Sequence, residues 1–269
     1  MRPRSARGFT LLELVVVIAI LAILTGILLP KFDVFKLKAN KAVAASNMTD
    51  ISRIIQTYYT QNSVYPDKWD SLLTPAGALW EATTPDEQGL EPQLTGSPGS
   101  ANPVKLTTLT LDPADPTDAG SLRSLQRIGI QTVLDLNALD VAPNERFTVP
   151  RVIGAASASY ATLNATDDDA AAIIRHIYPN DQPVLTDPPA AAVVPTGKQL
   201  IVLGFGSHNT SIGNIVQEVP FYPNTDVTKY YSRFLAVFEV GGGSRAELKA
   251  VIGADGDPIF DEMGDYFER

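Results

Sequence analysis

Glu13 is the residue whose chemistry is most conspicuous in this sequence. It is the one charged residue between Phe9 and Leu29, a run of 21 residues rich in leucine, isoleucine and valine. A carboxylate in apolar surroundings loses hydration, which costs free energy unless a positive group compensates for it. We therefore expect Glu13 to have a charged partner or a specific role.

Few other residues could support catalysis. The chain has no cysteine, which excludes disulfides, a thiolate nucleophile and cysteine-ligated metals. Its two histidines, His176 and His208, lack the spacing of a metal-binding pair, and we expect His208 in a turn after a strand. Neither a Gly-x-Ser-x-Gly elbow nor a phosphate-binding loop occurs. The sequence predicts a protein that is not an enzyme, with no catalytic residue and no cofactor.

Two acidic segments could bind a cation. Asp167–Asp169 open the segment Ala170–Tyr178, which we expect to be a helix that these acids cap, with metal binding as the alternative. The loop Asp255–Glu262 resembles a calcium loop faintly, because calcium takes six to eight oxygen ligands. Its EF-hand spacing is incomplete, and Asp-Gly is typical of hairpin turns. We predict a turn and no metal site, and calcium binding stays open as the alternative.

Charge is distributed unevenly along the 269 residues. The formal net charge is −9, yet Arg2, Arg4 and Arg7 lie in the first eight residues without any acid. The part expected to fold as a domain is acidic, whereas a nucleic-acid-binding domain carries a basic surface. We therefore predict no nucleic-acid partner.

The apolar run is long enough to cross a bilayer. As a helix rising about 1.5 Å per residue, Phe9–Leu29 would extend about 31 Å, close to the hydrocarbon thickness. The arginines before it predict a cytoplasmic N-terminus. We predict a transmembrane helix over 9–30. An ordinary signal anchor is one interpretation of this segment. A cleaved signal peptide fits poorly, because its apolar region is about 7–15 residues long.

A second helical segment should follow over 31–65. Leu28–Pro30 predicts a kink or local unwinding, and Pro66 prevents the helix from continuing beyond Tyr65. Lys41 interrupts an otherwise apolar stripe. The stripe has a period of about 3.6 residues and consists of Val34, Leu37, Ala44, Met48, Ile51, Ile55 and Tyr58.

The remainder, 66–269, is predicted to be an α+β head. Asp67–Leu73 reads as a capped helical turn, and a Pro/Gly-rich insertion covers about 74–196. We expect its first part, Thr74–Leu122, to be a surface loop with short strands such as Val104–Leu111. Further expected elements are a helix over Ser121–Gly129, an edge strand over Phe147–Ile153, and an antiparallel sheet packed on the long helix, formed by Gln199–Phe205, Arg233–Val240 and Leu248–Ile252.

The run Gly8-Phe9-Thr10-Leu11-Leu12-Glu13 before the apolar segment resembles the processing motif of type IV pilins and type II secretion pseudopilins. The resemblance implies that residues 1–8 are a leader, which a prepilin peptidase removes between Gly8 and Phe9. It also implies that the new amine of Phe9 is methylated. Glu13, then the fifth residue, would pair with the Phe9 amine of a neighbouring subunit during assembly.

A second segment, Tyr58–Pro66, resembles the helix end of major pseudopilins, with Ser63 where glycine is usual. This favours the pseudopilin branch over other pilins. Major pseudopilins often bind calcium near their C-terminal loops, which is a further reason to keep the calcium alternative for Asp255–Glu262.

The resemblance implies a structural subunit of a type II secretion pseudopilus that drives protein export. Its partners would be other copies of itself, other pseudopilins, the prepilin peptidase, the inner-membrane assembly platform and membrane lipid. The protein would be anchored in the inner membrane with a periplasmic head, and would form part of a filament after assembly. One alternative is a minor pilin of a type IV pilus or DNA-uptake system. Another is an enzyme or binding domain tethered by a signal anchor.

Overall fold

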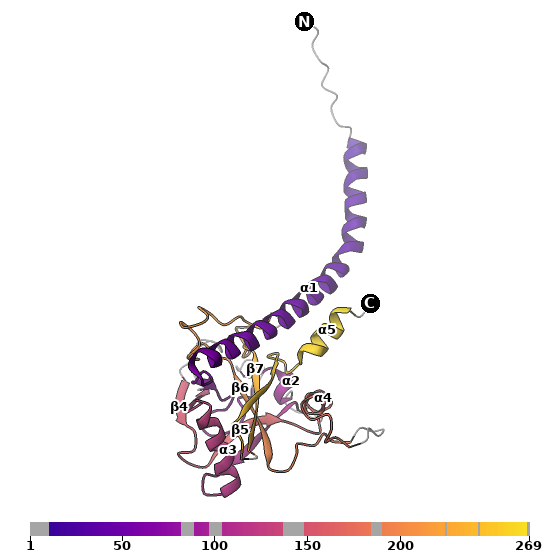
Figure 1. Ribbon diagram of the computed structural model, residues 1–269. Coiled ribbons are helices and arrows are strands. Elements are labelled where there is room, and N and C mark those ends of the chain that lie inside the picture. The colour runs from indigo at the N-terminus through magenta and orange to yellow at the C-terminus, as the bar shows by residue number, and fades with distance from the viewer. Residues whose placement is uncertain are drawn as a thin grey trace.

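The protein is α+β, with a long N-terminal helix that projects from a head built around a β-sheet (Figure 1). The computed structural model describes most of the chain, namely residues 11–81, 89–96, 104–136, 148–183, 190–223, 225–241 and 243–267. Gly8 and Phe9 therefore lie outside the described residues.

Helix α1 spans Leu11–Asn62 without interruption. Of the two alternatives expected at Leu28–Pro30, local unwinding is wrong, because the helix continues through Pro30. The helix does bend along its length (Figure 1). Only the C-terminal half of the predicted apolar stripe is buried in the head. Its contact residues are Ala44, Met48, Ile51 and Ile55, all at most 1% exposed.

None of the helices in the described part of the chain meets the length and apolarity needed to cross a membrane.

The main sheet has six strands in the order β4-β3-β1-β6-β7-β8. Strands β6, β7 and β8 are antiparallel neighbours, which confirms the predicted C-terminal meander. Strand β4 contains Pro150 and lies at the edge of the sheet, as predicted for a strand in which proline cannot donate a hydrogen bond. The strands are β1 Trp69–Asp70, β3 Thr132–Leu136, β4 Thr148–Val152, β6 Lys198–Gly204, β7 Leu235–Gly241 and β8 Glu247–Ile252.

The central strands are buried on both faces. Ile201 and Phe238 pack on the α1 side, and Val202 and Val237 pack in a second core on the opposite side. Residues of the stretch 74–196 build most of that second core. The surface-loop interpretation of Thr74–Leu122 is therefore wrong for the part that the structure describes, since Trp80, Leu90, Leu94 and Leu106 are at most 1% exposed.

A small two-stranded sheet accompanies the second core. Strand β2 pairs in antiparallel register with β5, so the expected short strand near Val104–Leu111 is confirmed. The remaining elements are helices that flank the sheets. Their bounds are β2 Leu106–Leu111, β5 Ala158–Leu163, α2 Pro92–Thr95, α3 Pro116–Arg127, α4 Asp168–Ile177 and α5 Ile259–Phe267.

The predicted helical turn at Asp67–Leu73 is wrong, because the segment is not helical and its residues Trp69–Asp70 form β1. The side chain of Asp67 accepts hydrogen bonds from the backbone N–H groups of Gln131 and Thr132, at 2.9 and 2.8 Å, instead of capping a local helix. Trp69 is fully buried between Phe205 and Phe238. Tertiary contacts thus override a local pattern that suits a capped turn.

Candidate assembly helix and carboxylate cluster

The first half of α1 presents an apolar surface that the other described residues of the chain leave uncovered. Every large apolar side chain from Leu11 to Leu24 is between 46% and 80% exposed. Phe32 and Phe35 continue this surface toward the head, at 63% and 67%. Apolar surface of this extent is typical of contact with lipid or with another protein.

Glu13 lies in the first turn of α1, and its side chain is exposed. A carboxylate is favourable at this place because the helix dipole puts partial positive charge at the N-terminus. The expected partners in processing and assembly, Gly8 and Phe9, lie outside the described residues, so the intermolecular pair stays a prediction.

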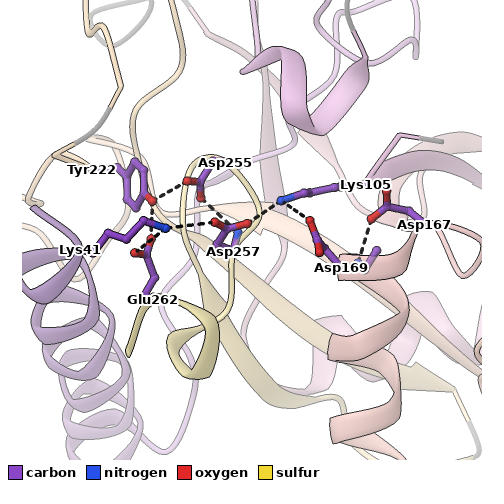
Figure 2. Close-up of polar contacts among 9 residues, drawn as sticks. Lys41, Lys105, Asp167, Asp169, Tyr222, Asp255, Asp257 and Glu262 are labelled. Atoms are coloured by element: carbon purple, nitrogen blue, oxygen red, sulfur yellow. Dashed lines mark hydrogen bonds and ion pairs between the residues drawn. The ribbon is translucent and has the colours of Figure 1, made fainter. Parts of the chain in front are cut away.

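A second polar site lies where α1, β2 and the C-terminal segment meet (Figure 2). Asp255 and Asp257 come from the turn after β8, and Glu262 comes from α5. One oxygen of each carboxylate lies within 4.8 Å of the other two. We call these three residues the carboxylate cluster.

The turn itself follows from the sequence. Gly256 has a φ of 88°, a conformation that glycine adopts without strain. The backbone N–H of Gly253 donates to the carbonyl oxygen of Asp257 at 2.8 Å and closes the turn. The predicted turn is therefore confirmed, and it also orients Asp255 and Asp257 toward each other. The fourth acid of this loop, Asp261, lies on the exposed side of α5.

Two lysines reach the cluster from distant parts of the chain. The ammonium of Lys105, just before β2, lies 2.5 Å from Oδ1 of Asp257 and 2.9 Å from Oδ2 of Asp169. The ammonium of Lys41, from α1, lies 3.9 Å from Oδ2 of Asp257 and 3.7 Å from Oε2 of Glu262. Both lysine side chains are largely buried, at 8% and 14% exposed.

Burial or neighbouring charges raise the pKa values of Glu262, Asp255 and Lys105. Burial raises the pKa of Glu262 to about 7, and Lys41 only partly opposes this effect. Burial and the neighbouring charge of Asp257 raise the pKa of Asp255. For Lys105, the charges and hydrogen bonds of Asp257 and Asp169 outweigh burial and raise its pKa. The ammonium of Lys105 is thus permanently charged at neutral pH.

Tyr222 joins two of the carboxylates. Its hydroxyl oxygen lies 2.5 Å from Oδ2 of Asp255 and also in hydrogen-bond contact with Oε1 of Glu262. A phenol has one proton to donate, so both contacts are satisfied when one carboxyl group is protonated and donates to the phenolic oxygen.

The cluster does not suit a resident divalent cation. Calcium takes six to eight oxygens at about 2.3–2.6 Å. Here both oxygens of Asp257 already face lysine ammonium groups, and Tyr222 lies against one oxygen each of Asp255 and Glu262. A divalent ion at this place would be repelled by the two positive charges.

Asp167, His208 and His176, which were singled out in the sequence, each make a contact in the structure. Asp167 caps α4, accepting a hydrogen bond from the backbone N–H of Ala170 at 3.0 Å, as predicted. His208 lies in an exposed turn after β6, with Nδ1 3.5 Å from the Ser207 hydroxyl. The ring of His176 lies near that of Phe260 on α5, with centroids 5.4 Å apart.

Sequence reasoning missed Lys105 and Tyr222 as members of this site. One signal was present, because Lys41 interrupts an apolar stripe on a helix that packs in the head. A lysine on such a face requires a buried counter-charge. The identity of that counter-charge depends on tertiary structure, since the cluster joins residues 41, 105, 169, 222 and 255–262.

Comparison with known proteins identifies the class. Residues 3–29 match the family described as "Prokaryotic N-terminal methylation motif". Such a motif, followed by a long helix and a β-sheet head, defines a pilin-like protein. The type IV wide pilus major component PilA4 of Thermus thermophilus is 30% identical over 112 residues, which cover 31% of this chain and 86% of that protein. The chain therefore belongs to the family of type IV pilins and type II secretion pseudopilins.

Two further relatives match 34% and 24% of the chain. Type II secretion system core protein G of Dickeya chrysanthemi is 40% identical over 91 residues, or 34% of this chain and 57% of that protein. Type IV major pilin protein PilA of Myxococcus xanthus is 34% identical over 65 residues, or 24% and 29% respectively. No solved structure matches the chain significantly. Each of these alignments therefore leaves about two thirds or more of this chain unmatched.

Proposed function

We propose that this protein is a structural subunit of a type II secretion pseudopilus. Residues 1–8 are the leader, a prepilin peptidase cuts between Gly8 and Phe9, and the new amine of Phe9 is methylated. The motif at residues 3–29 and the relatedness to secretion protein G support this proposal.

The observation that carries the proposal is the uncovered apolar half of α1. Large apolar side chains from Leu11 to Leu24 are exposed around the helix. Before assembly, lipid covers this surface, and residues 9–30 anchor the protein in the inner membrane with a periplasmic head. After assembly, neighbouring α1 helices cover it. Repeating one such head-to-tail contact builds an open filament.

Glu13 sets the register of that filament. Its carboxylate pairs with the Phe9 amine of the adjacent subunit, and the apolar surroundings make the unpaired charge costly. Two helices can therefore slide past each other only by breaking this pair. Partners in this account are copies of the same chain, other pseudopilins, the prepilin peptidase and the inner-membrane assembly platform.

Replacement of Glu13 tests the proposal. Glu13→Ala should still insert in the membrane, and should lose filaments when pseudopilus assembly is followed by electron microscopy and shearing. Asp50→Ala is the matched control, because Asp50 is an exposed acid on the same helix, within the head, and pairs with Arg53 three residues away. Normal filaments from Glu13→Ala would refute the assigned role.

A second candidate is a type IV pilus subunit. It is favoured by the relative from Thermus thermophilus, of which the alignment covers 86%. Deletion of the gene distinguishes the two systems. Loss of exported proteins from the medium with surface pili retained supports the secretion system, and the opposite result supports the pilus.

A further inference from the structure

The carboxylate cluster holds the C-terminal segment against α1 by means of charges from the chain itself. Lys41 comes from the long helix, Lys105 precedes β2, and the acids follow β8 (Figure 2). We propose that the ammonium groups of Lys41 and Lys105 take the place of a divalent cation in this cluster. Docking of the C-terminal segment is then independent of calcium.

Asp257 is held between the two lysines. Its two oxygens face different lysines, at 2.5 Å from Lys105 and 3.9 Å from Lys41. Direct coordination of calcium would need such an oxygen at about 2.3–2.6 Å from the ion. The ammonium of Lys105 therefore lies as close to Oδ1 of Asp257 as a bound calcium ion would lie.

The carboxylates of the cluster are largely buried and need charge compensation. Glu262 is fully buried, and Asp255 is 7% exposed. Several carboxylates this close require positive charge nearby, which a metal ion or lysines can supply. Here Lys41 lies 3.7 Å from Glu262, so the helix supplies that charge directly.

Lys41 lies on the buried face of α1. Its neighbours Ala44, Met48 and Ile51 pack in the core, so the lysine is held on the face of the helix that meets the C-terminal segment. The ion pair with Glu262 then joins α1 to α5 across 221 positions of sequence, the difference between residues 41 and 262. This fixes α5 on the helix that carries the assembly surface.

Removing the two lysines should convert the cluster into a site for a divalent cation. In Lys41→Met/Lys105→Met the carboxylates keep their positions on the turn and on α5, but lose the positive charge that neutralises them. An uncompensated buried charge is destabilising. The same oxygens then become able to bind a divalent cation.

The experiment uses the full-length protein in detergent and two readouts. Terbium(III) replaces calcium as a luminescent probe, and Tyr222 serves as the sensitiser because it contacts Asp255 and Glu262. Thermal unfolding is measured in parallel with calcium chloride or EDTA. The inference does not depend on filament assembly, since both readouts apply to the unassembled protein.

Wild type should bind no terbium that calcium can displace, so its luminescence should not saturate. Its Tm should be the same with calcium chloride and with EDTA. Lys41→Met/Lys105→Met should melt at a lower temperature in EDTA and give saturable luminescence. Calcium at about 100 times its Kd should raise the Tm of this variant by roughly 5–10 °C. Adding Asp257→Asn to the double variant should abolish both responses.

Saturable, calcium-displaced terbium binding to wild type, or a calcium-dependent Tm, would overturn the inference. A folded double variant that binds no terbium and whose Tm does not change with calcium would also overturn it. If the double variant does not fold, Lys105→Met alone decides by the same two readouts, because its ammonium is the one that lies 2.5 Å from Asp257.

Discussion

Ser63 ends α1 in a backbone conformation that favours glycine. Its φ is 60°, and its N–H donates to the carbonyl oxygen of Tyr59 at 2.7 Å. This is the position where major pseudopilins usually carry glycine, so the departure in sequence coincides with a left-handed residue. A non-glycine residue there costs roughly 1–2 kcal/mol.

Ser63→Gly should therefore stabilise the protein. Relief of the left-handed strain exceeds the extra chain entropy of glycine, so we expect a gain of up to about 1 kcal/mol in the free energy of unfolding. Urea denaturation measures it. Ser63→Ala is the control and should show no gain, because alanine keeps the strain.

Asp70 is a buried acid whose ionisation opposes folding. It is 5% exposed and accepts a hydrogen bond from the hydroxyl of Tyr231 at 2.8 Å. Burial raises its pKa from 3.8 to about 7, with Tyr231 and Arg233 opposing the shift. Between these two values the folded state binds a proton that the unfolded chain lacks, so stability falls as the pH rises.

Asp70→Asn should remove this pH dependence. The amide cannot ionise, so the free energy of unfolding of the variant should rise relative to wild type by about 2–3 kcal/mol between pH 5 and pH 8. Urea titrations at both pH values measure the difference. The exposed substitution Asp50→Asn should show no comparable change. If the difference in free energy of unfolding between Asp70→Asn and wild type is the same at pH 5 and pH 8, Asp70 is not the group responsible for the pH dependence.

Among the elements, those with strong local patterns were predicted best. The last three strands lie within two residues of their expected ends, and α1 follows its apolar stripe from Ala44 to Ile55. Strand β1 could not be predicted, because it has two residues and is held by neighbouring strands and by buried Trp69. Its local sequence, with Asp67 at a capping position, favours a helical turn.

The stretch 74–196 contributes Trp80 to the second core. Trp80 is 1% exposed and packs with Leu90 and Leu94 in the second core. Trp80→Ala should cost about 3–5 kcal/mol, the range for large aromatic residues in cores. Val193→Ala, an exposed position in the same stretch, should cost far less. A loss for Trp80→Ala as small as that for Val193→Ala in urea denaturation would mean that packing of Trp80 does not contribute to the fold's stability.

At the scale of the whole molecule, the need for a second layer can be deduced from the sequence. Leu200–Leu203 and Leu235–Phe238 are unbroken apolar runs, which are typical of strands covered on both faces. Helix α1 covers one face, so the long Pro/Gly-rich stretch had to cover the other. The carboxylate cluster was beyond such reasoning, because Lys41, Lys105 and Glu262 meet only in the folded chain.

The processed N-terminus is the most direct test of the account as a whole. Mass spectrometry of the protein from membranes of cells with a working prepilin peptidase should find a chain that begins at methylated Phe9. The same preparation from cells lacking the peptidase should retain residues 1–8. An intact leader beginning at Met1 in the presence of the peptidase would contradict the claim that this protein is a processed filament subunit.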